Sequence, residues 1–334
     1  MKTLAQIEPR TPVGEATTPG DASSLYSITQ PGAYYLTTNV LGVANRYGIS
    51  IDADNVTLDL NGFALIGITN SRAGIIILNT SSNICVRNGA IQGWGSAGLY
   101  MSSGYGCIYE GLRLAGNGGD GLRAGLVSVV KACTSIGNSG VGISASMGSV
   151  VTGCAMRNNG GHGLLASNSG VLVSECNSLE NGGDGFHGAT SVSYKHCFAR
   201  GNDGHGLYAD TGSSFLECQA AVNGTNGIHA RARSFVLHND CSNNSAAGIA
   251  VDADASRIEA NTVTGNTGPG IKVNGTVNLV IQNSARGNGG NGNYDIVSGN
   301  RVGLIVIPTL SGAITGNGPG SGLGTTDPWA NFAF

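Results

Sequence analysis

Several side chains that can transfer protons recur at two fixed places in the chain. His162, Asp184 and His205 each stand directly before a glycine. His187 and Tyr208 each stand two residues after a glycine of the same kind, and three further polar residues share this second place: Arg123, His229 and Lys272. Imidazole, carboxylate and phenol groups held side by side can take a proton from carbon and return one. The two places therefore predict a polar stripe suited to acid–base chemistry, provided that they lie on one face.

These places belong to a repeat of 21–23 residues. Nine asparagines each precede a glycine of the repeat by four residues: Asn117, Asn138, Asn159, Asn181, Asn202, Asn223, Asn244, Asn266 and Asn288. A short period with Asn and Gly at set positions is typical of a stacked solenoid, in which each repeat forms one coil. We therefore expect an all-β chain of roughly eleven coils between Ile49 and Gly292, with three short strands in each coil.

Two columns of the repeat predict ladders of stacked side chains. Five cysteines stand nine residues before the column glycines, and asparagines continue this column: Cys133, Cys154, Cys176, Cys197, Cys218, Asn239, Asn261 and Asn283. Coils lie about 4.8 Å apart, so stacked Cβ atoms are too distant for an ordinary disulfide, and we expect buried reduced thiols. A redox or metal thiolate site is the alternative, but no CxxC pair supports it. The asparagines of the other column should pass amide hydrogen bonds between coils, and asparagine tolerates a left-handed turn conformation.

Composition and segment boundaries exclude some classes of function. The net charge is −3 and no run of Lys and Arg occurs, so we expect no nucleic-acid partner. No apolar stretch approaches the roughly 20 residues of a membrane span. Residues 1–48 predict an extended lead-in and N-terminal cap, in which 26–48 form a hairpin or a capping strand. Residues 49–307 predict the coils, and 308–334 a C-terminal tail whose aromatic end either folds back as a plug or docks on another subunit.

At these columns the chain resembles the right-handed parallel β-helix superfamily, the pectin-lyase-like fold. The resemblance rests on NVTLDLNGFAL at 55–65, on repeats of the form NGGDGL and NGGHGL, and on NYDIV at 293–297. These motifs are similar to those of a largely uncharacterised group of secreted bacterial β-helix repeat proteins. The resemblance implies an extracellular or cell-surface location and that Met1 is not necessarily the natural start. The N-terminal residues lack a signal peptide's apolar block, so composition alone leaves a cytoplasmic location open.

The superfamily includes pectate lyases, polygalacturonases, alginate epimerases and phage tailspikes, so the fold does not assign an activity. GHG at 161–163 and at 204–206 is similar to a polygalacturonase motif. The rest of that pattern is missing, because Gly183 precedes Asp184 in place of a paired Asp and no RIK triplet follows. Inverting glycosidases need carboxylates about 6.5–9.5 Å apart, whereas Asp120 and Asp184 are three coils, or about 14 Å, apart. Glycoside hydrolysis is therefore disfavoured.

The resemblance to lyases and epimerases implies that the polar stripe abstracts a proton at a sugar C5. The candidate catalytic residues are His162, Asp184, His187, His205 and Tyr208. The candidate substrate-binding residues are Arg123, His229 and Arg231. One alternative is a polar face on which the Asp pairs locally with its histidine neighbours. The other is a metal site, but a lone His-Asp-His triple lacks the fixed spacing of metal motifs, so we expect no metal there.

Two further groupings of charged residues give less specific signals. Asp210, Asp252 and Asp254 form a sparse cluster of oxygen ligands. This cluster is a weak candidate for a Ca²⁺ site, and otherwise we expect no cofactor. Directly before the cysteine column, acid and imidazole alternate in consecutive coils: Glu175, His196, Glu217 and His238. This alternation predicts cross-strand pairs that stabilise the surface.

Two hypotheses about function follow. In the first, the protein binds a polysaccharide in an outward groove and modifies it by lyase-like or epimerase-like chemistry. In the second, it is a non-catalytic structural or adhesive module, such as a surface fibre or a phage spike, that assembles as a homo-oligomer through its aromatic tail. Because the chain lacks paired carboxylates and a basic clamp, the sequence favours binding or scaffolding over turnover.

Overall fold

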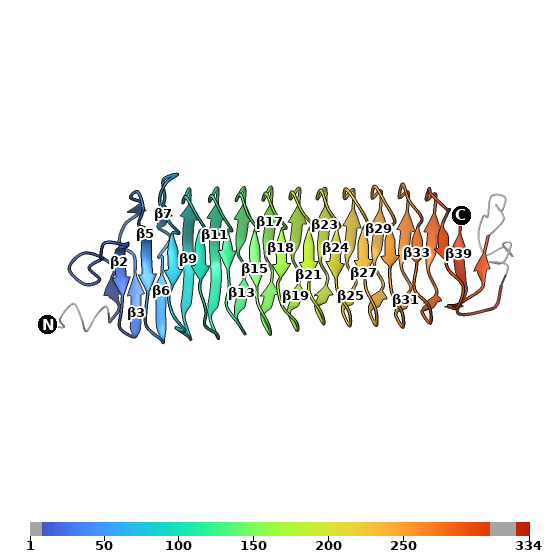
Figure 1. The fold of residues 1–334 in the computed structure, drawn as a ribbon, viewed down its shortest axis with the longest axis horizontal. Coiled ribbons are helices and arrows are strands. Elements are labelled where there is room, and N and C mark those ends of the chain that lie inside the picture. The colour runs from blue at the N-terminus through green and yellow to red at the C-terminus, as the bar shows by residue number, and fades with distance from the viewer. Residues whose placement is uncertain (1–8, 308–324) are drawn as a thin grey trace, which may run out of the picture. The chain divides into compact units, whose positions relative to one another are not determined.

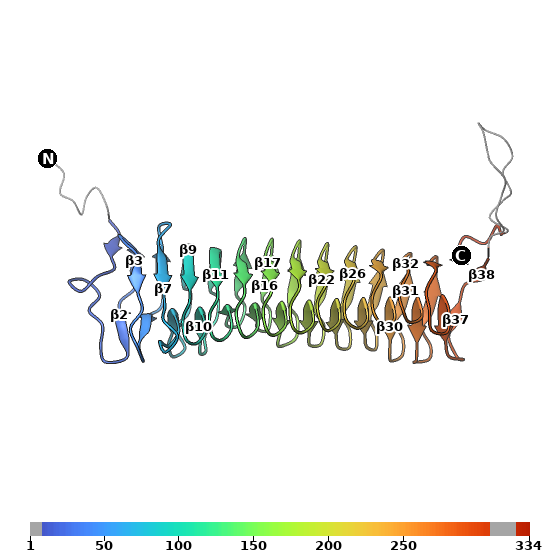
Figure 2. The same cartoon turned by 90° about the horizontal axis from the view of Figure 1, so that it is seen from above.

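The computed structural model describes residues 9–307 and 325–334, and these form strands and turns without a helix. The described residues therefore include no helix long and apolar enough to cross a membrane. The chain divides into two compact units, Met1–Gly188 and Ala189–Phe334. Within each unit the chain winds in coils, and neighbouring coils lie side by side with parallel strands (Figures 1 and 2). One strand of each regular coil belongs to sheet 1, and the other two belong to sheet 2.

The strands of the first unit are short, apart from two long strands that cover both sheet 2 positions of a coil. Sheet 1 contains β2 (Ser24–Ile28), β5 (Tyr47–Ile51), β8 (Ile75–Ile77), β10 (Leu99–Met101), β12 (Leu122–Arg123), β15 (Ile143–Ala145), β18 (Leu164–Ala166) and β21 (Phe186–Gly188). Sheet 2 contains β1 (Thr11–Pro12), β3 (Gly32–Tyr35), β4 (Val40–Leu41), β6 (Val56–Asp59), β7 (Ala64–Ile66), β9 (Cys85–Gln92), β11 (Ile108–Ala115), β13 (Val129–Lys131), β14 (Thr134–Ile136), β16 (Val150–Thr152), β17 (Ala155–Arg157), β19 (Leu172–Ser174) and β20 (Asn177–Leu179).

The second unit repeats this arrangement. Sheet 1 contains β24 (Leu207–Ala209), β27 (Ile228–Ala230), β30 (Ile249–Val251), β33 (Ile271–Val273) and β36 (Tyr294–Ile296). Sheet 2 contains β22 (Ser193–Lys195), β23 (Phe198–Arg200), β25 (Ser214–Leu216), β26 (Gln219–Ala221), β28 (Phe235–Leu237), β29 (Asp240–Ser242), β31 (Arg257–Glu259), β32 (Thr262–Thr264), β34 (Leu279–Ile281), β35 (Ser284–Arg286), β37 (Arg301–Val302), β38 (Ile305–Val306) and β39 (Asn331–Ala333).

The strand register confirms the columns read from the sequence. In the first unit, Leu122 pairs with Ile143 and Ile143 with Leu164, and all three side chains are fully buried. Successive residues of a strand point to opposite faces, so the residues that follow these lie outside the core. On sheet 1 the outward row therefore contains Arg123, Ser144, Leu165 and His187 in the first unit, and Tyr208, His229, Ala250 and Lys272 in the second.

The coils continue beyond both ends of the expected array. Residues 26–48 do not form a hairpin, because β2 pairs in parallel with β5, and β3 pairs in parallel with β6. The turn at Pro31-Gly32 leads the chain from sheet 1 to sheet 2 of the same coil. The described residues form about 14 coils instead of the expected eleven, because the first segment and the C-terminal strands are themselves coils.

The asparagine ladder is confirmed in both units. In the second unit, the backbone N–H and the side-chain amide of Asn223 both donate to Oδ1 of Asn244, at 3.0 and 2.9 Å. The left-handed conformation does not fall on the ladder asparagines. It falls on the residue directly before each of them, such as Asn243 and Val222, with φ values of 54–66°. This preceding residue makes the corner, and the ladder asparagine can therefore direct both of its N–H groups along the stack.

The cysteine column is a ladder of thiols, as expected. All eight cysteines are free, and seven of them are buried. The column thiols donate to backbone carbonyls, such as Cys133 Sγ to the carbonyl of Lys131 at 3.4 Å and Cys218 Sγ to that of Leu216 at 3.3 Å. These thiols are therefore protonated at neutral pH and pack as small apolar groups.

The C-terminal strand β39 lies on the chain's own last coils. It pairs in parallel with β35 and with β38. Asn331 is fully buried and accepts both N–H groups of Asn283, so it continues the second asparagine ladder. The part of the expected tail at 308–324 lies outside the described residues.

Candidate functional site

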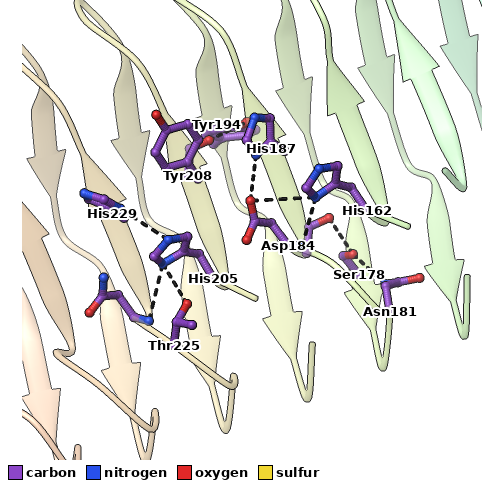
Figure 3. A network of polar contacts seen from close by, with 12 residues as sticks. His162, Ser178, Asn181, Asp184, His187, Tyr194, His205, Tyr208, Thr225 and His229 are labelled. Atoms are coloured by element: carbon purple, nitrogen blue, oxygen red, sulfur yellow. Dashed lines mark hydrogen bonds and ion pairs between the residues drawn. The ribbon is translucent and has the colours of Figure 1, made fainter. Parts of the chain in front are cut away.

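Three of the predicted catalytic residues form a cluster in the first unit (Figure 3). His162 lies in the turn before β18, Asp184 lies in the turn before β21, and His187 is the central residue of β21. Nδ1 of His187 lies 2.6 Å from Oδ2 of Asp184. Nδ1 of His162 lies 3.7 Å from the same oxygen, and the two imidazole rings stack with their centroids 4.4 Å apart. Asp184 is 7% exposed, so its carboxylate meets the histidines in a largely desolvated position.

Backbone geometry assigns different roles to the two histidines. The backbone N–H of Asp184 donates to Nδ1 of His162 at 2.9 Å, so this nitrogen carries a lone pair and Nε2 carries the proton of the neutral ring. Burial lowers the pKa of His162, and the neighbouring His187 lowers it further, although Asp184 opposes this shift. His162 is therefore a neutral ring that packs against His187. In the tautomer that donates from Nδ1 to Asp184, His187 has its lone pair on Nε2, as a general base requires.

In the described part of the chain, these three side chains are the one group of His, Cys, Asp and Glu residues whose spacing would let them hold a metal ion together. Their ligand atoms all lie within 4.8 Å of one another. Two histidines and one carboxylate are a donor set that Zn²⁺ accepts. However, the two rings are only 26° from parallel, so their in-plane lone pairs do not converge on one point. Nδ1 of His162 also already accepts the N–H of Asp184. The geometry therefore fits proton transfer better than metal binding.

A second cluster, in the second unit, is a chain of hydrogen bonds through two histidines (Figure 3). Thr225 Oγ1 lies 2.8 Å from Nδ1 of His205. Nε2 of His205 lies 3.3 Å from Nδ1 of His229. Nε2 of His229 lies 2.6 Å from Oδ2 of Asp252. The chain thus runs from a hydroxyl group to a carboxylate over three consecutive coils.

The groups at the two ends of this series of hydrogen bonds fix the same donor-to-acceptor direction along it. Burial opposes ionisation of Asp252, but hydrogen bonds from Asn274 and His229 outweigh burial, and the net pKa of Asp252 is lowered. An ionised Asp252 requires the proton of His229 on Nε2. At the other end, the backbone N–H of Asn226 points at Nδ1 of His205 from 3.4 Å, which favours a lone pair there. His205 therefore donates from Nε2 to His229 and accepts from Thr225.

Tyr208 completes the second cluster, because its ring packs against the imidazole rings of His205 and His229. Its ring stacks with that of His205, with centroids 5.8 Å apart, and meets the ring of His229 edge-on at 5.3 Å. The phenol hydroxyl donates to Oδ1 of Asp210 at 2.8 Å. From the core, the hydroxyl of the fully buried Tyr194 donates to the backbone carbonyl of Tyr208 at 3.1 Å. These contacts fix the phenol on the outward face of sheet 1.

The candidate binding residues lie at different distances from the clusters. Arg123 shares its outward row with His187, but Ser144 and Leu165 stand between them, so the two are about 14 Å apart. The guanidinium of Arg123 lies over the ring of Tyr100, 5.3 Å from its centroid. It also lines a cleft of about 240 Å³ with polar side chains that include Ser102, Ser103, Ser144, Ser146, Ser167 and Asn168. In the second unit, His229 belongs to the hydrogen-bonded chain, and Arg231 helps to lower the pKa of Asp252.

The remaining charged groupings are engaged in local contacts. Asp252 accepts from His229 and Asn274, and Oδ1 of Asp254 accepts the backbone N–H of Thr276 at 2.6 Å. These contacts direct the two carboxylates to different partners. In the alternating column, His196 Nε2 contacts Glu217 Oε2, so the expected acid–imidazole pair forms between these two residues.

Sequence reasoning missed some members of the second cluster. Thr225, which contacts His205, carries no signal beyond its place in a turn, whereas Asn226 stands directly before a column glycine, in the same column as His205. Asp252 was considered only as a calcium ligand. A usable signal was present, because Asp210, Arg231 and Asp252 each stand four residues after a column glycine in consecutive coils. Such a column at the edge of the outward row predicts partners for the His and Tyr residues beside it.

A family model described as the right handed beta helix region matches residues 47–236 and 186–302. The chain belongs to the right-handed beta helix family. Among solved structures, this β-helix is similar to the A-module of the mannuronan C-5 epimerase AlgE6 of Azotobacter vinelandii, with a TM-score of 0.52 and 14% identity. That match covers 90% of this chain and 89% of the epimerase module.

This β-helix is also similar to the Dettilon tailspike protein, with a TM-score of 0.56 and 13% identity over 84% of this chain and 62% of the tailspike chain. No curated protein sequence gives a significant match. At these identities the structural likenesses show the fold alone. The family match confirms the superfamily expected from the sequence, whereas the chemistry must be argued from the side chains.

Proposed function

We propose that this protein binds a polysaccharide along the outward face of sheet 1, outside the cell or at its surface, and transfers protons at a sugar carbon. The observation that carries the proposal is the contact between His187 and the largely buried carboxylate of Asp184. A carboxylate that holds one imidazole nitrogen fixes the ring and stabilises the imidazolium that forms when the other nitrogen takes a proton. This pair lies on the same outward row as Arg123, as a polymer-binding face requires.

The chemistry fits a sugar whose C5 proton is made acidic by an adjacent carboxylate. His187 would take this proton, and delivery of a solvent proton to the opposite face of C5 would give an epimer. If the C4–O bond breaks instead and the leaving oxygen takes a solvent proton, the products are a C4=C5 unsaturated sugar and an alcohol, as in a lyase. Arg123, three coils away, would hold the polymer at a different sugar residue. The fold likeness to a mannuronan C-5 epimerase is compatible with this reaction class. The hydrogen-bonded chain in the second unit offers a separate acid–base centre.

The proposal is tested with the purified chain and a panel of acidic and neutral polysaccharides. Binding is measured on a glycan array, lyase activity by the absorbance of unsaturated uronate, and epimerase activity by uptake of solvent deuterium at C5. We expect His187→Gln and Asp184→Asn to lower turnover by about 100-fold or more, with polymer binding retained. The matched control is His196→Gln, because this histidine pairs with Glu217 in the column beside sheet 2.

Failure of the wild-type chain to bind any polysaccharide would overturn the proposal as a whole. Binding without turnover would reject the proton transfer and leave a polysaccharide-binding module. Equal activity of His187→Gln and wild type would move the chemistry away from the first cluster. A parallel His205→Gln variant tests the second cluster in the same assays.

A second candidate function is a non-catalytic structural or adhesive module that assembles through its aromatic C-terminal strand. The observation that favours it is Phe334, which is 54% exposed beside Phe332 at the end of β39. Sedimentation over a range of concentrations tests it, with Phe334→Ser as the variant. Oligomers that persist in Phe334→Ser, or their absence in the wild type, would reject assembly through this strand.

A further inference from the structure

A cavity lies on sheet 2 of the second unit, away from the outward face of sheet 1. Its volume is about 490 Å³, within the range of roughly 300–1,000 Å³ that is common for ligand pockets. Its lining is mainly apolar but carries three charged side chains. The residues that shape it are Arg257, Leu279, Ile281, Arg301, Asp327 and Trp329.

The floor of the cavity follows from the strand register. Arg257 on β31 pairs with Leu279 on β34, and Leu279 pairs with Arg301 on β37. Neighbouring strands lie about 4.8 Å apart, so two arginines flank one leucine in a row along the sheet. The aliphatic parts of such side chains form an apolar floor, while their guanidinium groups stay in water.

Trp329 forms the wall of the cavity, and its backbone is firmly held. Two hydrogen bonds from Gln282 reach the carbonyls of Trp329 and Pro328, at 3.3 and 3.0 Å. The backbone N–H of Trp329 donates to Oδ1 of Asp327 at 2.9 Å. Gly303 permits this close approach, because a Cβ atom there would lie 2.1 Å from the carbonyl oxygen of Trp329. The Trp329 residue is nevertheless 51% exposed, so a fixed backbone presents an aromatic side chain to solvent.

The two arginines differ in their partners. Arg257 is paired with Glu259, and this contact raises the pKa of the guanidinium. Arg301 is exposed and has no ion pair among the residues that the structure describes. In the same described set, the ring of Trp329 makes no aromatic or cation–π contact. The cavity therefore combines an open aromatic face with an open cation.

We infer that this cavity binds a pyranose that carries an anionic group, a carboxylate or a sulfate ester. The C–H face of the sugar ring packs on the indole of Trp329 and on Leu279. The anionic group accepts hydrogen bonds from the guanidinium of Arg301, whose planar donors suit carboxylate and sulfate oxygens. Arg257 is a positioning residue, because Glu259 holds it at the far side of Leu279. This site is independent of the proton transfer proposed for sheet 1.

Charge and shape favour this ligand class over others. An apolar peptide or a lipid chain would use the floor but leave Arg301 without a partner. A simple inorganic anion would use Arg301 but leave the indole exposed. A charged sugar satisfies both features, because its ring is apolar on one face and carries its charge at the edge.

The chain provides a fluorescent reporter for this test. It contains two tryptophans, and Trp94 is 1% exposed and therefore shielded from soluble quenchers. Iodide quenching of the full-length protein thus reports on Trp329. The titrants are an oligogalacturonate, a neutral galactose oligomer of equal length and a sulfated galactose oligomer. We expect the charged oligomers to protect Trp329 from iodide and the neutral oligomer to bind about tenfold more weakly or worse.

Variants separate this site from bulk charge effects. Arg301→Gln should weaken binding of the charged oligomers by about tenfold or more, whereas Arg286→Gln, an exposed arginine on β35, should not. Trp329→Leu, followed by calorimetry, should also weaken binding. His187→Gln should leave this binding unchanged whatever its effect on turnover. The preference between the carboxylated and the sulfated oligomer identifies which anion the site takes.

Equal binding of neutral and charged oligomers would overturn the inference, and so would unchanged binding by Arg301→Gln. Protection of Trp329 that rises with protein concentration in the absence of sugar would overturn it as well. That result would instead identify the surface as a contact between copies of the chain.

Discussion

Asn244→Ala should be among the most destabilising single substitutions in the second unit. The Asn244 side chain is fully buried in the asparagine ladder and takes part in four hydrogen bonds. Its Oδ1 accepts the backbone N–H and the side-chain amide of Asn223, at 3.0 and 2.9 Å. Its Nδ2 donates to the carbonyl of Ala220 and to Oδ1 of Asn266, at 3.0 and 2.9 Å.

The size of the effect follows from the groups that lose their partners. Alanine leaves two buried donors of Asn223 without this acceptor, and each such loss costs about 1–3 kcal/mol. Oδ1 of Asn266 still accepts the backbone N–H of residue 244, so its loss is partial. We therefore expect the free energy of unfolding to fall by about 2–6 kcal/mol. The matched control is Asn168→Ala, because Asn168 is exposed and should change stability by less than about 0.5 kcal/mol.

The assay combines denaturant unfolding, followed by far-ultraviolet circular dichroism, with hydrogen exchange. Repeat proteins depend on contacts between neighbouring coils, so the loss should concentrate in the coils that contain residues 223, 244 and 266. Amides there should exchange about 30-fold faster or more, which corresponds to 2 kcal/mol or above. A loss below about 1 kcal/mol, or an effect no larger than that of Asn168→Ala, would refute the claim that the ladder stabilises the stack.

Three further predictions concern strain, protonation and thiols. Val222 is a β-branched residue with φ of 58° at a corner where the other coils have Gly, Asn or, once, Glu180. Val222→Asn should therefore raise the free energy of unfolding by about 1 kcal/mol, and an unchanged or lower unfolding midpoint would contradict this. Burial and the nearby His187 lower the pKa of His162 below 6.5 in the folded protein. The unfolded chain therefore binds a proton at His162 more tightly than the folded protein does. The stability that His162 contributes is complete above about pH 6.5 and is lost as the pH falls through the folded-state pKa. An NMR titration of His162 should show a midpoint below 6.5, and His162→Gln should flatten the fall in stability between pH 7 and 5; a midpoint at or above 6.5 would reject the assignment. A soluble thiol reagent should label at most Cys85 in the native protein and all eight cysteines after unfolding. Labelling of fewer than eight cysteines after unfolding without reductant would show that disulfides are present.

The columns of the repeat were predictable because stacking is a one-dimensional property. Once the coil length is nearly constant, residues at equal phase must lie above one another, and the residue type then decides the contact. Asn244 stacks on Asn266, and Leu122 stacks on Ile143, as their spacing requires. The same logic gave the buried reduced thiols, since equal phase holds their Cβ atoms too far apart for an ordinary disulfide.

The candidate site was predictable only as a set of residues on one face. The sequence placed His162, Asp184 and His187 on adjacent turns and strands, but not which side chain contacts which. The structure pairs Asp184 with His187 three residues along its own coil, while it connects His229 to Asp252 in the next coil. These choices depend on the bend of each turn and on side-chain rotamers, and neither quantity is fixed by repeat spacing.

By itself, the sequence determined the coil, its phase and the ladders that stabilise it, because these follow from periodic spacing and residue size. Tertiary structure decided where protons reside. The N–H of Asp184 sets the tautomer of His162, and the N–H of Asn226 together with Asp252 sets the direction of the His205–His229 chain. It also decided that Trp329 stands half exposed beside Arg301. Each of these outcomes depends on backbone groups or end strands from other parts of the fold, whose positions exist only once the coils have packed.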